Sequence, residues 1–287
     1  MEDSVPEAFH TCEQVSRTLE YAYDDFVLAQ VLQKLETSDD YFPDPQKTGL
    51  YDTLMIRARY YRNVINPSTG YAQGRYAAGN AYSFTRFITE GAPCHYTWYA
   101  PHDIYGLMEC MGGKEKYIAK LDSMFSEHRY WHGNEPCHQI AYLFNYAGQP
   151  WKTQREVRHI METEYLNAPG GLSGNDDAGQ MSAWYVFSAM GFYPVCPGTP
   201  YYIIGSPSFP RMSIRLENGK TFTILANNAN KKNIYIQSAK LNGKENDKNY
   251  YTQQDIVQGG ILEFQMGPNP NTSWGASALS LPPDNMK

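Results

Sequence analysis

The sequence predicts a mainly helical protein whose C-terminal part is rich in β-strands, and two patterns carry this prediction. Up to residue 192, apolar residues recur mostly at the spacing of helix faces. From residue 193 onward, short runs alternate apolar and polar residues, as strands with one buried face do. We therefore expect a helical region over residues 1–192, followed by an antiparallel β region and a tail over 193–287.

In the helical region, segments that are apolar all round alternate with amphipathic ones. The predicted helices cover residues 16–36, 48–64, 101–113, 114–128, 136–148, 150–165 and 177–191. Ser16 is a plausible N-cap of the first helix, and the nearly all-apolar segment 136–148 predicts a buried helix. The charged face of 150–165 places that helix on the outside. An inner ring of helices wrapped by an outer ring, a partial α/α toroid, has this alternation, and a plain helix bundle has it almost as well.

The β region is predicted from four alternating runs, over residues 201–207, 211–229, 233–245 and 259–267. Two Asn-Gly pairs, at 218–219 and 242–243, are typical of tight hairpin turns. We expect these runs to form a small antiparallel sheet or part of a β-sandwich. The remaining residues, 267–287, are expected to form a loose tail.

Composition argues against several classes of partner. The formal net charge is -6, so no basic patch is expected to bind nucleic acid or an anionic membrane. No apolar run approaches the roughly 18 residues of a membrane-spanning helix, and no signal peptide is visible at the N-terminus. The five cysteines form no CxxC pair and are odd in number, so most are expected to be buried free thiols. The 24 tyrosines favour a surface for carbohydrate or peptide.

Polar residues that could carry chemistry gather in three loops between the predicted helices. The candidates are Glu90, Tyr96 and Trp98 in the first loop, His132, Asn134, Glu135 and His138 in the second, and Asn175, Asp176 and Asp177 in the third. A further acidic pair, Asp24 and Asp25, lies inside the first helix and is expected to be structural or solvent-facing.

The third loop places two adjacent acids, Asp176 and Asp177, just before a predicted helix. One aspartate would suffice as an N-cap. The second adds repulsion between like charges unless a cation, a hydrogen-bond donor or a reaction uses it. The loop's Gly170, Gly171 and Gly174 would let the backbone turn sharply and approach a ligand.

These loops contain the groups that a glycosidase needs. Such an enzyme uses one carboxyl to protonate the leaving oxygen and a second to activate water or to attack the sugar. Aromatic side chains hold the sugar ring, and Asn, Gln and His contact its hydroxyls. No phosphate-binding loop, GxSxG elbow or HExxH motif accompanies the loops. Cys94 adjoins His95, but neighbours in sequence rarely form a catalytic dyad.

Three stretches resemble glycoside hydrolase family 92, the calcium-dependent, inverting, exo-acting α-mannosidases. They are TEGAPCHYTWYAPHD, GNEPCHQIAYLFNYAGQPWKTQ and GLSGNDDAGQMSAWYVFSAMGFYPVCPGTPYYIIGSPSF, which begin at residues 89, 133 and 171. The resemblance extends from about Ser16 into the C-terminal strands. It implies an (α/α)6 catalytic barrel, strands that belong to the family's β-sandwich region, and a secreted or periplasmic location.

The resemblance also implies roles for individual residues. Glu90 matches the family's general acid, and Asp177, assisted by Asp176 or Asn175, matches its base loop. Glu135 and His138 match the GNEPxH motif that lines the sugar site, so we expect Asn134, His132, Trp98 and Tyr96 to contact a mannose-containing glycan with them. The implied calcium ion is expected near Glu135, Asn175 and Asp177.

The chain departs from the family in sequence and in length. Ala92 and His95 replace the amides common near the acid. Asn134 replaces the His of some α-1,2-acting members, which leaves the linkage open, and the resemblance as a whole implies α-1,2 or a related linkage. Family members are more than twice as long, so the missing N-terminal half is a possible partner. Two alternatives stay open: an inactive fragment that binds carbohydrate, and a polysaccharide lyase with a Tyr or His base.

Overall fold

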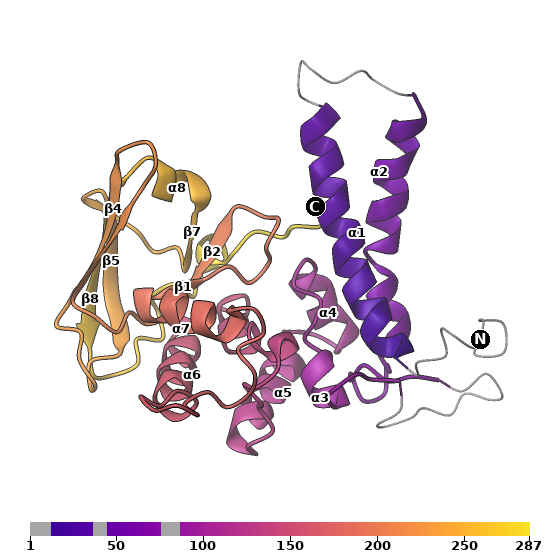
Figure 1. Ribbon diagram of the computed structural model, residues 1–287, viewed down its shortest axis with the longest axis horizontal. Coiled ribbons are helices and arrows are strands. Elements are labelled where there is room, and N and C mark those ends of the chain that lie inside the picture. The colour runs from indigo at the N-terminus through magenta and orange to yellow at the C-terminus, as the bar shows by residue number, and fades with distance from the viewer. Residues whose placement is uncertain (1–12, 37–44, 76–86) are drawn as a thin grey trace. The chain divides into compact units, whose positions relative to one another are not determined.

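The computed structural model describes residues 13–36, 45–75 and 87–287, and these residues form two compact units (Figure 1). The first unit extends to Tyr130 and also contains Asp284–Lys287, and the second is Trp131–Pro283. The predicted change from helices to strands is confirmed at β1, Phe192–Tyr193, within the second unit. In the described residues, no helix is long and apolar enough to span a membrane.

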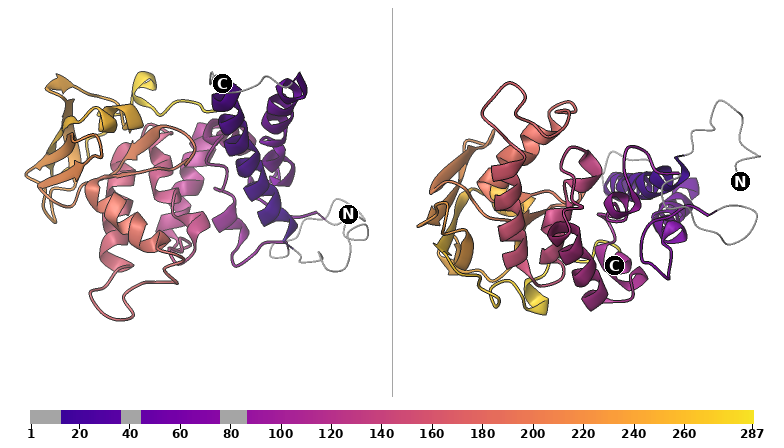
Figure 2. Two further views of the ribbon diagram at one scale, coloured as in Figure 1. Left: turned by 45° about the horizontal axis from the view of Figure 1, so that its top comes forward. Right: turned by 90° about the horizontal axis from the view of Figure 1, so that it is seen from below.

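The first unit is helical. Its elements are α1 (Gln14–Glu36), α2 (Pro45–Arg57), η3 (Tyr60–Val64), α3 (Pro93–Tyr96), α4 (Ile104–Cys110) and α5 (Lys114–Ser126). Helices α1 and α2 lie side by side (Figures 1 and 2) and pack through Ala29, Leu32 and Leu54. Asp25 is buried and accepts a 2.9 Å hydrogen bond from Arg57 Nε, which confirms its structural role.

The start of α1 differs from the prediction. Ser16 lies inside the helix, and its Oγ accepts a 2.8 Å hydrogen bond from the backbone N–H of Thr89. The prediction of Ser16 as an N-cap is therefore wrong. A serine hydroxyl can satisfy a distant backbone group as well as the end of its own helix, and sequence position alone does not distinguish the two.

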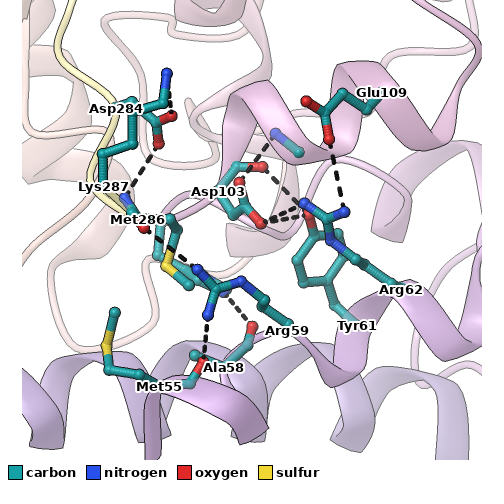
Figure 3. A network of polar contacts seen from close by, with 12 residues as sticks. Met55, Ala58, Arg59, Tyr61, Arg62, Asp103, Glu109, Asp284, Met286 and Lys287 are labelled. Carbon is teal, nitrogen blue, oxygen red and sulfur yellow. Dashed lines mark hydrogen bonds and ion pairs between the residues drawn. The ribbon is translucent and has the colours of Figure 1, made fainter. Parts of the chain in front are cut away.

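A buried carboxylate connects η3 to α4 (Figure 3). Asp103 caps α4 by accepting from Gly106 N at 2.9 Å, and it also accepts from Tyr61 Oη at 2.7 Å and from Arg62 Nη2 at 3.1 Å. The arginine side chain provides the charge that a buried carboxylate requires. In the same figure, Arg59 Nη2 donates to the carbonyl oxygen of Met286 at 3.3 Å, which joins the C-terminal residues to this unit.

The second unit combines helices with two small sheets. Its helical elements are η4 (Glu135–Cys137), η5 (Ile140–Asn145), α6 (Pro150–Thr163), α7 (Gln180–Met190), α8 (Gln253–Val257) and η6 (Ala278–Ser280). Its other strands are β2 (Tyr201–Ile204), β3 (Arg211–Arg215), β4 (Thr221–Asn227), β5 (Tyr235–Leu241), β6 (Lys244–Glu245), β7 (Tyr250–Thr252) and β8 (Gly260–Gly267). The strand orders are β1-β2-β7 and β3-β4-β8-β5-β6.

One buried cluster joins both sheets, α7 and the tail. Phe192 and Ile204 of the smaller sheet pack in it with Phe222 and Phe264 of the larger one. Both predicted hairpin turns are confirmed, since β3 pairs with β4 and β5 with β6 in antiparallel fashion. The expectation of a purely antiparallel sheet is wrong, because β4 and β8 are parallel.

Two further predictions for this unit are corrected. Residues 136–148 are buried as expected, but they form the 3₁₀ turns η4 and η5 instead of one α-helix. The tail is packed rather than loose. Trp274 is 4% exposed, and its Nε1 donates to Asn246 O at 3.2 Å.

The tail therefore contributes to stability. Replacing Trp274 by Ala is expected to lower the free energy of unfolding by about 3–5 kcal/mol, because a large ring leaves a packed core. Leu279→Ala is the matched control in the same tail. Leu279 is 89% exposed, so its removal should change stability by less than about 0.5 kcal/mol. Urea denaturation checks both variants, and equal effects would contradict the packing of the tail.

Candidate active site

Two of the three predicted loops meet within the second unit at a pair of glycines. A Cβ atom on Gly174 would lie 2.4 Å from the carbonyl oxygen of Gly133 and 2.6 Å from its Cα. A Cβ atom on Gly133 would lie 2.8 Å from the carbonyl oxygen of Ser173. These separations are too short for any side chain. Gly174 of the third loop thus allows the backbone of the second loop to approach closely, whereas the sequence predicted the approach of a ligand.

The third loop begins with a short hairpin that is attached to α7. Tyr165 and Leu172 form an isolated antiparallel bridge, and Leu166 N donates to Gly171 O at 2.8 Å. The hydroxyl of Tyr165 donates to Met181 O at 2.9 Å, on the first turn of α7. This bond positions the hairpin against the helix that the acidic loop precedes.

The two adjacent aspartates have different surroundings. Asp176 Oδ1 accepts hydrogen bonds from both the backbone N–H and the hydroxyl of Ser182, each at 2.9 Å. The carbonyl oxygen of Asp176 also accepts from Gly179 N and Met181 N, both at 3.2 Å. Asp176 is therefore an anchor of the start of α7, the structural role that a single aspartate was expected to fill.

Asp177 is exposed on a backbone of unusual conformation. Asp177, Ala178 and Gly179 have φ angles of +47°, +55° and +93°, so three successive residues lie in the left-handed region. Residues other than glycine rarely adopt it, and such strain is frequent at functional sites. With Asp176 anchored, the turn presents the second carboxylate at the surface.

A cluster of histidine and aromatic rings supports the two loops from beneath. His132 and His138 are each 1% exposed, and their ring centroids lie 4.7 Å apart. The ring of His132 meets that of Trp184 edge-on at 4.4 Å, and Trp184 Nε1 donates to His138 O at 2.9 Å. These contacts attach the second loop to α7.

The hydrogen bonds determine the tautomers of both histidines. His138 Nε2 lies 3.0 Å from the carbonyl oxygen of His132, which can only accept, so this nitrogen carries the proton. Gln180 Nε2 then donates to His138 Nδ1 at 3.3 Å and to Tyr193 Oη at 3.1 Å. Because Tyr165 uses its proton on Met181, its oxygen accepts from His132 Nε2 at 2.6 Å.

Burial keeps this cluster uncharged. It lowers the pKa of His132 to about 2, and His138 contributes a smaller part of this shift. Burial also lowers the pKa of His138, although the charge of Asp177 raises it. Burial also raises the pKa of Tyr193 to about 12 and raises the pKa of Tyr165. Neutral rings with such pKa values hold loops in place and do not exchange protons near pH 7.

The remaining residues of these loops lie at different depths. Asn134 is 9% exposed, Glu135 is half-buried at the start of η4, and Asn175 is exposed. In the described part of the chain, no group of three or more His, Cys, Asp or Glu side chains is placed to hold a metal ion. The predicted calcium set of Glu135, Asn175 and Asp177 contains an asparagine, which lies outside these residue types, so it stays a prediction.

Glu90, the predicted acid, belongs to the first unit. It is exposed and has a φ angle of +46°, so Glu90 and Asp177, two of the three predicted catalytic carboxylates, lie on left-handed backbone. The next turn is formed by His95, whose Nδ1 accepts from Ala92 N at 3.1 Å and whose Nε2 donates to Arg129 O at 3.0 Å. Because both ring nitrogens have these partners, His95 shapes the loop and forms no dyad with Cys94.

The two aromatic residues predicted beside Glu90 are buried. Trp98 is 0% exposed and packs edge-on against Tyr117 at 5.4 Å, and Tyr96 is 4% exposed. Their packing makes them core residues of the first unit, and their predicted contacts with sugar stay predictions.

Two residues important for the second unit's loops were not among the predicted site residues. Tyr165 joins His132 to α7, and Ser182 binds Asp176. For Tyr165, the only signal in the sequence was the excess of tyrosine. For Ser182, its position six residues after Asp176 matches no capping pattern. The four described cysteines are free, two of them buried, and Cys12 lies outside the described residues.

The sequence matches a known family of glycoside hydrolases. The model of the glycosyl hydrolase family 92 catalytic domain matches residues 4–268. The chain belongs to this family. A secreted glycosidase of Arthroderma benhamiae is 30% identical over 297 aligned positions, which include 95% of this chain and 38% of the relative.

Solved structures agree with the family assignment. A family GH92 α-mannosidase from Bacteroides thetaiotaomicron is 42% identical with a TM-score of 0.86, over 95% of this chain and 37% of that one. An inverting family GH92 mannosidase from Bacteroides thetaiotaomicron VPI-5482 is 38% identical with a TM-score of 0.85, over 95% of this chain and 40% of that one. This family 92 chain thus spans about two fifths of the length of these relatives.

The neutral histidine cluster predicts how stability depends on pH. The folded protein keeps His132 uncharged to a pKa of about 2, whereas the unfolded chain binds a proton near pH 6.5. Stability from this group is therefore complete above pH 6.5 and is lost as the pH falls toward 2. Between pH 7 and 5, the free energy of unfolding should fall by about 1–2 kcal/mol through His132 alone.

The variant His132→Gln isolates this contribution, since it keeps an N–H donor for Tyr165 and removes the titrating ring. Urea denaturation at pH 7 and pH 5 should give a smaller pH-dependent loss for the variant than for the parent chain. Parallel losses in the two proteins would mean that His132 is not held neutral.

Proposed function

We propose that this family 92 chain carries part of the active site of an exo-acting α-mannosidase, and that the mature enzyme inverts the sugar configuration. The observation that carries the proposal is the division of roles in the third loop. Asp176 accepts hydrogen bonds that stabilise the start of α7, while Asp177 is exposed on a strained turn beside the second loop. A carboxylate presented in this way suits a general base.

The relatives support the choice of substrate and outcome. One Bacteroides thetaiotaomicron α-mannosidase, 39% identical to this chain, was solved in complex with mannoimidazole. Another relative is named as an inverting mannosidase. We infer the same substrate class, a mannose-containing glycan, and a preference for α-1,2 or a related linkage. An (α/α)6 barrel with part of a β-sandwich and a location outside the cytoplasm belong to the same proposal.

In the proposed reaction, Glu90 donates its proton to the glycosidic oxygen as the bond from that oxygen to the anomeric carbon breaks. Asp177 removes a proton from a water molecule, whose oxygen attacks the anomeric carbon from the opposite face. The product is β-mannose. Proton exchange with water then returns the proton that Glu90 lost and removes the one that Asp177 gained. Inversion requires the two carboxyls to be about 6.5–9.5 Å apart in the active enzyme.

The other predicted residues would orient the sugar. Glu135 and Asn134 of the second loop would accept and donate hydrogen bonds to hydroxyls, while His132 and His138 hold the loop that carries them. Calcium suits oxygen ligands such as those of Glu135, Asn175 and Asp177. These residues would hold the ion, and no step of the proposed reaction is assigned to it.

Replacing each carboxylate tests this assignment. Asp177→Asn and Glu90→Gln should each lower kcat for release of mannose from an α-mannoside by about 10²-fold or more, because general acid and base groups contribute that much. Asp176→Asn is the matched control. Its amide oxygen still accepts from Ser182, so its kcat should stay close to that of the parent chain.

Nuclear magnetic resonance of the first product provides the second readout. Initial β-mannose supports inversion, and initial α-mannose would contradict it. Loss of kcat in Asp176→Asn with full activity in Asp177→Asn would exchange the two roles. Binding of an α-mannoside without turnover supports a carbohydrate-binding module, and unsaturated products support a lyase. Repeating the assay with a calcium chelator tests the requirement for the ion.

A further inference from the structure

The turn that carries Glu90 is held by a hydrogen bond on each side. Before Glu90, the backbone N–H of Thr89 donates to Ser16 Oγ at 2.8 Å. After it, the backbone N–H of Ala92 donates to His95 Nδ1 at 3.1 Å. Glu90 itself has a φ angle of +46°, which residues other than glycine rarely adopt, so its backbone needs such support. The two bonds fix the backbone that presents the proposed acid.

The bond to His95 is one half of a capping box at the start of α3. Ala92 is the N-cap of this helix, and His95 is its third residue. A Glu or Gln commonly fills that position and accepts from the N-cap N–H with a side-chain oxygen. Here the acceptor is an imidazole nitrogen, whose protonation state changes near neutral pH. The support of the turn therefore includes a group that titrates.

The second ring nitrogen determines which atom of His95 carries the proton. His95 Nε2 lies 3.0 Å from the carbonyl oxygen of Arg129, which can only accept, so Nε2 is protonated. In the neutral ring, Nδ1 then keeps the lone pair that accepts from Ala92 N. Neutral His95 thus connects the turn of Glu90 to the residues that follow α5.

Packing transmits a change at His95 to the residue beside Glu90. His95 is half-buried and Tyr96 is buried, and both lie against Gly91. A Cβ atom on Gly91 would lie 3.2 Å from the ring of Tyr96 and 3.5 Å from His95 Nδ1. A shift of the peptide between Gly91 and Ala92 would therefore alter the backbone next to Glu90.

Protonation of Nδ1 removes the bond to Ala92. A charged imidazole has a donor on each nitrogen and no acceptor, so its Nδ1–H would face the N–H of Ala92. The bond from Nε2 to the carbonyl oxygen of Arg129 persists in the charged ring and keeps the ring in place. The peptide of Ala92 must then move away, and the turn of Glu90 loses one of its two supports.

The surroundings keep the ring uncharged at neutral pH. Burial lowers the pKa of His95 from its ordinary value of 6.5, and the bond to the Arg129 carbonyl raises it by a smaller amount. Burial also raises the pKa of the Cys94 thiol, so this neighbour is uncharged near pH 7. In the described elements that adjoin the ring, the groups that can carry charge are Glu90, Cys94, Glu127, His128 and Arg129, and Glu127 and Arg129 form an ion pair with each other.

We propose that His95 positions the proposed acid Glu90, and that it does so only while its ring is uncharged. Above pH 6.5 the bond to Ala92 holds the turn, and below the pKa of His95 the turn loses this bond. The consequence is an acidic limit of activity that the two catalytic carboxylates do not set. This inference rests on the proposed role of Glu90, and its first test does not use turnover.

Nuclear magnetic resonance of the full chain labelled with ¹⁵N tests the bond directly. As the pH is lowered from about 7.5 to about 5, the amide signals of Gly91 and Ala92 should shift together, with a midpoint below 6.5. His95→Gln keeps a side-chain acceptor at this position of the capping box and does not titrate, so its two signals should not move. His128→Asn is the matched control. It removes the exposed ring beside Arg129 on left-handed backbone, which Asn tolerates, and its signals should titrate as in the parent chain.

The pH dependence of kcat for release of mannose from an α-mannoside is the second test. One pH unit below the midpoint, about one ring in ten is uncharged. The ratio of kcat at that pH to kcat at about pH 7.5 should then be up to about tenfold smaller for the parent chain than for His95→Gln. His95→Leu makes neither bond. Its kcat at about pH 7.5 should fall by about tenfold or more with a smaller change in KM, because a slight misplacement of a catalytic group has such an effect.

Three results would overturn the inference. The first is an Ala92 signal that does not titrate in the parent chain. The second is a titration that persists in His95→Gln, which would assign it to another group. The third is a titration of the bond combined with the same pH dependence of kcat in the parent chain and in His95→Gln. A chain that releases no mannose at any pH would contradict the proposed function instead, and the amide titration would still decide whether His95 controls the turn.

Discussion

The contact between the backbones of Gly133 and Gly174 is the constraint on which the candidate site depends. The carbonyl oxygen of one residue occupies the space that a side chain on the other would need. This contact joins the GNEP loop to the loop that carries both aspartates. The bond of Tyr165 to Met181 and the edge-on contact between the rings of His132 and Trp184 then attach both loops to α7.

Within this frame, residues of similar chemistry perform different tasks. Asp176 stabilises the start of α7, and its neighbour is presented on left-handed backbone. The buried histidines remain neutral and donate hydrogen bonds to oxygen atoms of the protein. The proposed reaction therefore assigns proton transfer to exposed carboxylates. The hydrogen bonds that hold the strained turn are made by Asp176 and by the backbone carbonyl oxygen of Asp177, which accepts from Gln180 N at 3.2 Å.

Local patterns predicted much of the fold. Helical spacing identified α1, α5, α6 and α7, and the Asn-Gly pairs identified two hairpins. Residues 136–148 are apolar at nearly every position, so their pattern indicates burial but does not separate an α-helix from 3₁₀ turns. The parallel pairing of β4 with β8 was not predictable for a related reason, because alternation is the same in either direction. Trp274 packs through contacts with distant strands, which composition does not reveal.

The site was predictable in its parts and not in its assembly. The acidic pair, the glycines and the GNEP motif are visible in the sequence, and the family resemblance gave them roles. Asp176 has the structural role because Ser182 donates hydrogen bonds to it. Gly174 must be a glycine because the backbone of a loop about 40 residues earlier in the sequence contacts it. Such pairings follow from tertiary packing, which local spacing does not encode.

The free energy of unfolding of Gly174→Ala, compared with that of Gly170→Ala, tests the central contact most directly. A Cβ atom on Gly170 has no atom within 4 Å, so that variant should match or slightly exceed the parent chain in stability. Gly174→Ala should lose about 1–3 kcal/mol, because its methyl group overlaps the backbone of Gly133. Equal stability of the two variants would contradict the account, because the two loops would then not be held together at this contact.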